Sequence, residues 1–385
     1  MPHAFQLKRN EIQTWMNLVF EDDLHAKRVE SLANATLGVL TSASLAVHAI
    51  GQGLAYARGL MTKHAVKQVD RLLSNAAIDV WTLFERWVPY VIGARKKIRV
   101  ALDWTEFDRD GHSTLALNLL TRHGRATPLL WMTVRKAELK DQRNAHEDAL
   151  LCRLREVLPP EVEVTVIADR GFCDTKLLNL LEHELGFGYV IRLRSNIWVT
   201  SKGGECRQAR DWVGAGGKAR TLRGATVTAE GYPVATVVCL QDKAMQEPWC
   251  LVASDPKAGS RELAKLYGQR WGIETWFRDT KTLRFGLGMS AIRTRDTARR
   301  DRLFLLAALA VVLMTLLGAA GESLGYDRML KSNTVKRRTH SLFRQGWMLY
   351  ELIPNMPAER LKPLMQRFAE MLQEQRLFTD IFGIV

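Results

Sequence analysis

The sequence has few features of secreted, zinc-finger or disulfide-rich proteins. Only five of its 385 residues are cysteine, an odd number, and they form no CxxC pair. Such usage is typical of a reducing compartment and argues against a disulfide framework or zinc knuckles. The N-terminal stretch 1–10 has no apolar core of the kind that a signal peptide carries. We therefore expect a cytoplasmic protein.

Long apolar runs are also scarce. The one such run, Leu303–Ala320, follows Arg299, Arg300 and Arg302. At a rise of ~1.5 Å per residue its length is at the low end of what a bilayer requires, and no second run accompanies it. We interpret it as a buried core helix and expect no membrane partner.

Acidic residues are fewer than basic ones. The chain has 55 Lys and Arg against 41 Asp and Glu, a net charge of +14, with 25% charged and 47% hydrophobic residues. This composition excludes a disordered chain, and the length predicts two or three folded modules. The excess positive charge indicates a polyanionic partner, and nucleic acid is the polyanion that it favours.

The first 97 residues have the apolar spacing of helices, broken by glycines. Within them, the segment 61–75 has Lys63, Lys67 and Arg71 at intervals of four residues, which brings them to one helical face. A basic helical face is more often a solvated surface than a DNA contact, and both interpretations stay open. Because of the net charge, Lys63 and Lys67 are candidate DNA contacts.

At Ile98 the pattern changes to short strands. Three strands, then helix, strand, helix and strand, are expected at Ile98–Leu102, Leu115–Arg122, Thr127–Arg135, Asn144–Val157, Val162–Ala168, Lys176–Leu185 and Tyr189–Leu193. This βββαβαβ order is what a ribonuclease H-like sheet requires, with the first three strands antiparallel. In such a sheet the first and fourth strands lie side by side. Asp103 and Asp169, at the ends of those two strands, are therefore expected to meet.

The pattern changes again after residue 195. Glycine-rich turns and β-prone stretches predict a β-rich insertion over 196–257, and Arg261 to about Leu283 has the pattern of one long helix. The predicted organisation is an α/β protein with five segments: a helical N-terminal DNA-binding domain (1–97), a ribonuclease H-like core (98–195), the β-rich insertion (196–257), the second part of the core with a glutamate-bearing helix (258–320), and a helical C-terminal region for DNA contact or dimerisation (321–385).

The strongest chemical signal lies in that long helix. Tyr267, Arg270, Glu274 and Lys281 are spaced by three, four and seven residues, so they fall near one stripe, which Arg278 shares. A stripe of a phenol, cations and a carboxylate does not resemble a core face and suits a groove in which phosphates lie beside carboxylate oxygens. For the helix taken alone, a solvated face with i, i+4 ion pairs is the more common arrangement.

The pattern Tyr-x2-Arg-x3-Glu-x6-Lys resembles the signature of the insertion-sequence-four family of DDE transposases. In that family the glutamate of the motif is the third catalytic carboxylate, and the core is ribonuclease H-like. The segments 102–105 (LDWT) and 168–172 (ADRGF) resemble those around the first and second catalytic aspartates. The resemblance extends from about Ile98 to Lys281.

The resemblance implies that Asp103, Asp169 and Glu274 hold two divalent metal ions, normally Mg2+, with Mn2+ as a substitute. Carboxylate oxygens suit such cations. The implied activity is cut-and-paste transposition of an insertion sequence: end cleavage, a hairpin intermediate and strand transfer. Double-stranded DNA, as inverted-repeat ends and target, is the implied partner of a homodimer that associates with the nucleoid. A related DDE nuclease and a domesticated DNA-binding protein derived from a transposase remain alternatives.

The resemblance also implies roles for residues around the carboxylates. Tyr267, Arg270 and Lys281 match positions that contact the phosphates of the transposon end, and Arg278 is a further candidate contact. Arginine binds phosphate through two parallel hydrogen bonds and lysine supplies a point charge, so the assignment is chemically sensible. Trp249 matches a tryptophan that stacks on a flipped base, although a tryptophan at the start of a strand is otherwise a core or rim residue.

Two further groups complete the predictions. Arg337 and Arg338 belong to a basic stretch, residues 331–344, that contacts DNA backbone or forms a solvated surface. Five carboxylates flank the three motifs and are expected to bind no metal: Glu106, Asp108, Asp110, Asp174 and Asp279.

Overall fold

The computed structural model describes residues 9–121, 123, 125–284 and 286–373. The N-terminal residues 1–8 and Arg122, at which one predicted strand ends, lie outside the described residues. The fold is mixed α/β, with a large sheet whose strand order is β3-β2-β1-β4-β5-β10-β9-β8-β6-β7. This arrangement is consistent with the ribonuclease H-like fold of a DDE transposase.

Helices form the N-terminal region, as the apolar spacing predicted. They are α1 (Arg9–Phe20), α2 (Ala26–Ser42), α3 (Val47–Arg58), α4 (Thr62–Leu73) and α5 (Val80–Ile92). Two glycines of this region have no room for a side chain: a Cβ on Gly38 would lie 2.5 Å from the carbonyl oxygen of Ile50, and one on Gly51 would lie 2.6 Å from Cα of Val66. Helices α2, α3 and α4 therefore pack backbone to backbone, which fixes the position of the basic helix α4.

The first five strands form one half of the sheet, with β3 at its edge. They are β1 (Lys97–Phe107), β2 (His112–Leu119), β3 (Thr127–Arg135), β4 (Glu163–Ala168) and β5 (Gly188–Arg192). β1 pairs with β2 in antiparallel and with β4 in parallel orientation, so the first and fourth strands are neighbours as expected. The prediction that the first strand ends before Asp103 is wrong. β1 continues to Phe107 because its pairing with β2 continues to His112.

Two helical segments connect these strands. The predicted helix before β4 is α6 (Arg143–Val157). The one before β5 is α7 (Thr175–Asn179), which continues as a π-helical turn over Leu180–Glu184. Both segments occupy the places that the sequence pattern indicated.

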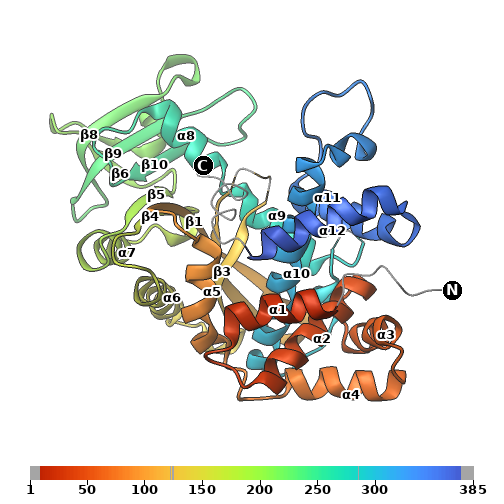
Figure 1. The fold of residues 1–385 in the computed structure, drawn as a ribbon. Helices are drawn as coiled ribbons and strands as arrows, with labels where there is room; N and C mark the ends of the chain where they lie inside the picture. Colours follow the sequence, from red (N-terminus) through yellow and green to blue (C-terminus); the bar gives the residue numbers. More distant parts are fainter. Residues whose placement is uncertain (1–8, 122, 124, 285, 374–385) are drawn as a thin grey trace.

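The later strands extend the same sheet. They are β6 (Trp198–Thr200), β7 (Cys206–Gln208), β8 (Arg220–Val227), β9 (Tyr232–Leu240) and β10 (Trp249–Ala253). β10 joins this group to the first five strands by antiparallel pairing with β5. In Figure 1, β8, β9 and β10 lie at one end of the molecule and α3 and α4 at the opposite end.

The predicted long helix over residues 261–283 is wrong, because two helices occupy this range. α8 (Ser260–Gly268) ends before α9 (Trp271–Lys281) begins. The amides of Arg270, Gly272 and Ile273 bond carbonyls three residues back rather than four, which tightens the chain at the junction. Gly268 and Gly272 flank the break, and glycine lowers helix propensity.

The long apolar run is the core of α10 (Thr297–Ser323). By length and composition this helix is able to cross a membrane, yet its most apolar window is buried entirely within the protein. It packs against α11 (Leu342–Leu352) and α12 (Ala358–Gln373), and also against α2 and β3. The interpretation as a core helix is confirmed.

Candidate active site

Two aspartates lie next to each other where the parallel pairing of β1 and β4 ends. Leu102 and Ala168 are the last paired residues, and Asp103 and Asp169 follow them directly. Neighbouring strands are about 4.8 Å apart, so the two residues lie side by side, Asp103 still within β1 and Asp169 just after β4. The sequence predicted this neighbourhood from the strand order alone.

Glu274 reaches the same place from helix α9. It lies in the first turn of α9, which packs against β1. The side chain of Arg270 connects the two elements: Nη1 donates to Oδ2 of Asp103 at 3.1 Å, and Nη2 donates to Oε1 of Glu274 at 2.7 Å. One guanidinium therefore joins the first aspartate to the glutamate.

The electrostatics agree with this proximity. Burial raises the pKa of Asp103 to about 6, the Arg270 guanidinium opposes that rise, and the carboxylates of Asp169 and Glu274 add to it. The side chains of Arg270 and Asp103 are 9% and 18% exposed, whereas that of Glu274 is 38% exposed. The carboxylates of Asp169 and Glu274 are thus close enough to act on that of Asp103, and the Arg270 guanidinium lies between Asp103 and Glu274.

The donor set suits a hard divalent cation, because all three groups are carboxylates. As they stand, however, no three acidic, histidine or cysteine side chains within the described residues converge closely enough to enclose a metal ion. Arg270 uses oxygens of Asp103 and Glu274 that a metal would need. The oxygens of these residues suit the expected metal, but in this structure the Arg270 guanidinium bonds two of them.

Tyr267 and Trp249 lie together on one side of this group. Their rings meet edge to face with centroids 4.9 Å apart. Tyr267 is buried, and this burial raises the pKa of its phenol. Trp249 is half-buried, and the Arg270 guanidinium lies 5.8 Å from the Tyr267 ring. The predicted base-stacking tryptophan therefore packs against the predicted phosphate-binding tyrosine.

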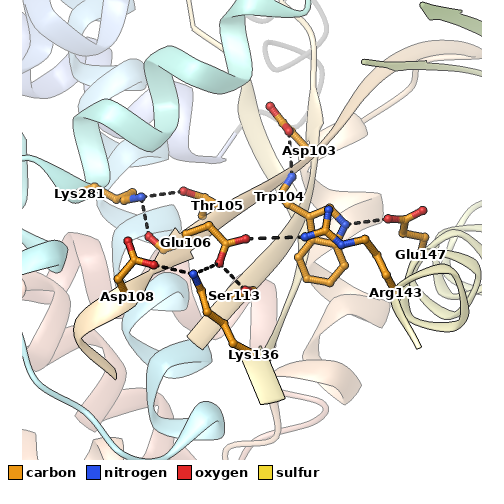
Figure 2. A network of polar contacts seen from close by, with 10 residues as sticks. All are labelled: Asp103, Trp104, Thr105, Glu106, Asp108, Ser113, Lys136, Arg143, Glu147 and Lys281. Carbon is orange, nitrogen blue, oxygen red and sulfur yellow. Dashed lines mark hydrogen bonds and ion pairs between the residues drawn. The ribbon is translucent and has the colours of Figure 1, made fainter. Parts of the chain in front are cut away.

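Lys281 ties the end of α9 to β1. Its Nζ donates to Oγ1 of Thr105 at 2.9 Å and to the carbonyl of Glu106 at 2.8 Å, and it lies 4.9 Å from the Phe107 ring. Burial lowers the pKa of this lysine. In Figure 2, Lys281 approaches β1 from the side opposite Arg143 and Glu147.

The five flanking carboxylates have partners of their own. Asp108 pairs with Lys136 at 2.5 Å, Glu106 pairs with the same lysine at 2.8 Å, and Asp174 accepts from the amide of Lys176 at 2.8 Å. Two of these contacts are drawn in Figure 2.

The other two flanking aspartates pair with arginines. Asp110 pairs with Arg300, and Asp279 pairs with Arg125 at 2.5 Å. Each of the five flanking carboxylates thus has a partner other than Arg270.

Two features next to the site were not predicted. The Trp104 indole donates to Oε1 of Glu147 at 2.7 Å and lies under Arg143 (Figure 2), and burial raises the pKa of Glu147 to about 7. No sequence signal indicates this contact, because it depends on how α6 packs. Trp271, 54% exposed beside Arg270, has a signal: it is an aromatic residue within the motif.

The remaining candidate DNA contacts lie outside this group. Arg278 is exposed in α9, and Lys63 and Lys67 are exposed on α4. Arg337 is exposed, whereas Nε of Arg338 donates to Glu322 at 2.8 Å. The structure therefore brings together Tyr267, Arg270, Glu274 and the two aspartates, but not these five residues.

Lys67 lines a groove between α2 and α4. The groove has a volume of about 590 Å³, and its lining includes Arg28, His64 and Arg71. Arg28, Lys67 and Arg71 pair with no carboxylate in the described part of the chain. Asp70, the acidic neighbour on α4, pairs instead with Arg299 at 2.7 Å. The groove is thus a cationic surface without local neutralisation.

The sequence of the chain matches one protein family. Residues 94–312, more than half of the chain, match the family described as the transposase DDE domain. The matched range contains the three carboxylates and the residues Tyr267, Arg270 and Lys281. No curated protein matches the chain.

Proposed function

The chain belongs to the family of transposases with a DDE domain, and from this premise we propose that it is a cut-and-paste transposase of the insertion-sequence-four type. Its substrates are double-stranded DNA ends and target DNA. The proposed reaction comprises cleavage at the ends of the element, hairpin formation by attack of the freed 3' hydroxyl on the opposite strand, hydrolysis of the hairpin, and strand transfer.

The observation that carries this proposal is the proximity of three carboxylates from distant segments. Asp103 and Asp169 follow the last paired residues of β1 and β4, and Arg270 links Glu274 to Asp103. A regulator that only binds DNA has no need of three such groups. Their arrangement supports an enzyme over a DNA-binding protein with an inactive catalytic fold.

Asp103, Asp169 and Glu274 would hold two divalent cations, normally Mg2+, with Mn2+ as a substitute. When bound, such a pair activates the attacking hydroxyl and stabilises the leaving oxygen of an in-line displacement. The side chain of Asp103 is 18% exposed and that of Glu274 is 38% exposed. A DNA strand would therefore approach the site from Glu274.

The cations and rings around the carboxylates would position the DNA end. Arg270 has the planar guanidinium that suits two oxygens of a phosphate, and Arg278 offers an exposed positive charge on the same helix. The edge-to-face pair of Tyr267 and Trp249 provides an aromatic surface for an unstacked base. Lys281, whose Nζ is held by Thr105 and Glu106, would contribute mainly through its charge.

The groove between α2 and α4 would contact the DNA backbone at a distance from the catalytic group. Lys67 and Arg71 are one helical turn apart, about 6 Å along α4, and Arg28 faces them from α2. A row of cations suits an extended polyanion better than a single phosphate ion. Lys63, one turn earlier on α4, would extend the row.

The division of the chain into segments 1–97, 98–195, 196–257, 258–320 and 321–385 is part of the same proposal. The core would be ribonuclease H-like with a β-rich insertion, and the last segment would contribute Arg337 and Arg338 to DNA or form a dimer contact. A homodimer is expected because two ends are joined in concert. The site of action would be the cytoplasm, with the enzyme on the nucleoid when bound to DNA.

A strand-transfer assay tests this function. The purified full chain is incubated with Mg2+ and duplexes taken from the DNA that flanks its own gene, and products are separated on denaturing gels. We expect nicked, hairpin and joined products from the wild type. We expect none of them from Glu274→Gln, in which glutamine keeps the size of the glutamate side chain but removes its charge.

The alternatives give different products. Cleavage without joining would identify a related DDE nuclease, and binding without cleavage would identify a domesticated DNA-binding protein. Full activity of Glu274→Gln would contradict the assignment of the carboxylates.

A further inference from the structure

Arg270 occupies the position where the carboxylates would otherwise face one another. Its two terminal nitrogens bind Asp103 and Glu274, and the side chain is only 9% exposed. Its Nε is buried without a hydrogen-bond partner among the described residues. The guanidinium is thus held by the carboxylates while one of its donors stays unsatisfied.

This contact competes directly with a divalent cation. Oδ2 of Asp103 and Oε1 of Glu274 each accept a hydrogen bond from Arg270. A carboxylate oxygen whose lone pair is used in such a hydrogen bond is a poorer ligand for a metal cation. The positive charge of the guanidinium also repels the metal. Arg270 therefore neutralises part of the site in the absence of DNA.

A DNA phosphate offers Arg270 a better partner. Phosphate presents several charged oxygens, which match the fork of a guanidinium and can also accept from Nε. Two aromatic rings lie beside the guanidinium. Arg270 is 5.8 Å from the Tyr267 ring and 5.7 Å from the ring of Trp271, and Trp271 is 54% exposed. The guanidinium can keep a cation–π contact with Trp271 while it leaves the carboxylates.

We propose that Arg270 acts as an internal counterion that hinders divalent cations from entering the carboxylate site until a phosphate of the DNA end takes its guanidinium. DNA and metal then bind cooperatively, and the free protein is kept from metal-dependent cleavage away from its DNA ends. This inference rests on the proposed function and goes beyond it, because a residue that only contacts phosphate has no effect on metal binding without DNA. Arg270 is in this sense a positioning residue with two alternative partners.

The test measures Mn2+ binding to the full chain by titration calorimetry, without DNA and with a pre-cleaved duplex end. The proteins are the wild type, Arg270→Ala, Arg270→Gln and Lys265→Ala. Gln keeps part of the side chain between the two rings if Ala proves unstable, and Lys265 is an exposed cation on α8 that serves as the control for the change in charge.

Without DNA, we expect both Arg270 variants to bind Mn2+ at least tenfold more tightly than the wild type and Lys265→Ala. Adding DNA should tighten Mn2+ binding by the wild type by a similar factor and by the Arg270 variants much less. Coupling is reciprocal, so Mn2+ should tighten DNA binding by the wild type by the same factor, and DNA binding by the Arg270 variants much less.

Two results would overturn the inference. If the Arg270 variants bind Mn2+ no more tightly than the wild type, or if Mn2+ binding by the wild type does not respond to DNA, Arg270 is no counterion to the site. In either case the proposed function stands as long as the wild type joins DNA. Absence of Mn2+ binding and of DNA joining in every protein would instead contradict the function itself.

Discussion

Two arginines connect helices to the first hairpin of the sheet, and they do so in different surroundings. Arg300 of α10 pairs with Asp110, donates from Nε to Nδ1 of His112 at 3.1 Å, and lies 3.9 Å from the Phe107 ring. The side chains of Arg300 and Asp110 are 0% and 6% exposed. Arg270 also pairs with carboxylates beside an aromatic ring, but Glu274, one of its partners, is 38% exposed.

The comparison shows that a buried ion pair does not by itself mark a functional site. Each guanidinium has one nitrogen without a hydrogen-bond partner among the described residues, so the two pairs do not differ in that respect. They differ in access and in the number of acids. Arg300 balances a buried aspartate inside the protein, whereas Arg270 balances two of three carboxylates at an edge that DNA can reach. The first contact is structural, and the second can be exchanged.

The largest expected effect is a difference in the free energy of unfolding between variants of these two arginines. Arg300→Gln leaves Asp110 buried without its cation, and we expect the free energy of unfolding to fall by about 3 kcal/mol. Arg270→Gln should cost about 1 kcal/mol or less, because Glu274 is partly solvated and Asp103 can take up a proton. Urea unfolding followed by far-ultraviolet circular dichroism measures both.

Exposed Arg278 of α9, replaced by Gln, is the control and should change the free energy of unfolding little. Equal losses for Arg300→Gln and Arg270→Gln would show that the two contacts are of the same structural kind, and the comparison would then fail.

A smaller effect is expected at the groove between α2 and α4, which carries cations but no catalytic acids. Lys67→Ala combined with Arg71→Ala removes two phosphate contacts, so affinity for duplex DNA at about 0.15 M salt should fall roughly tenfold. The slope of log affinity against log salt should become less negative by about 1.8, which is about 0.9 for each contact. Fluorescence anisotropy at several salt concentrations measures both quantities.

The matched control for the groove is Lys202→Ala combined with Lys218→Ala, two exposed cations of segment 196–257 that have no proposed DNA contact. An unchanged salt slope in the groove variant, or the same change in both double variants, would remove the groove from the DNA interface. Loss of DNA joining in the groove variant on saturating DNA would place its role in catalysis rather than in binding.

The sequence predicted most of the elements that position the site. The bounds of β3 agree with those of the expected strand, because β-branched and aromatic residues lie between clear turn signals. The neighbourhood of Asp103 and Asp169 followed from the order of strands, since parallel neighbours end at the same edge of a sheet. Local pattern and topology were sufficient for these features.

The sequence did not predict features that depend on tertiary contacts. The extension of β1 past Asp103 is set by its pairing with β2, and the break before Trp271 follows from turns that no periodicity reveals. The bridge from Arg270 to Asp103 joins residues 167 positions apart. The motif suggested an i, i+4 pair of Arg270 with Glu274, but only the packing of α9 on β1 adds the aspartate.

The most direct test of the central claim compares two aspartates of one segment. Asp103→Asn and Asp108→Asn remove the same charge five residues apart, and only Asp103 lies among the three carboxylates, whereas the Asp108 side chain is 83% exposed and pairs with Lys136. First-strand cleavage of a duplex end is measured with Mg2+ and with EDTA. The account predicts Mg2+-dependent cleavage by the wild type and Asp108→Asn and no detectable cleavage by Asp103→Asn. Cleavage by Asp103→Asn at the wild-type rate would contradict it.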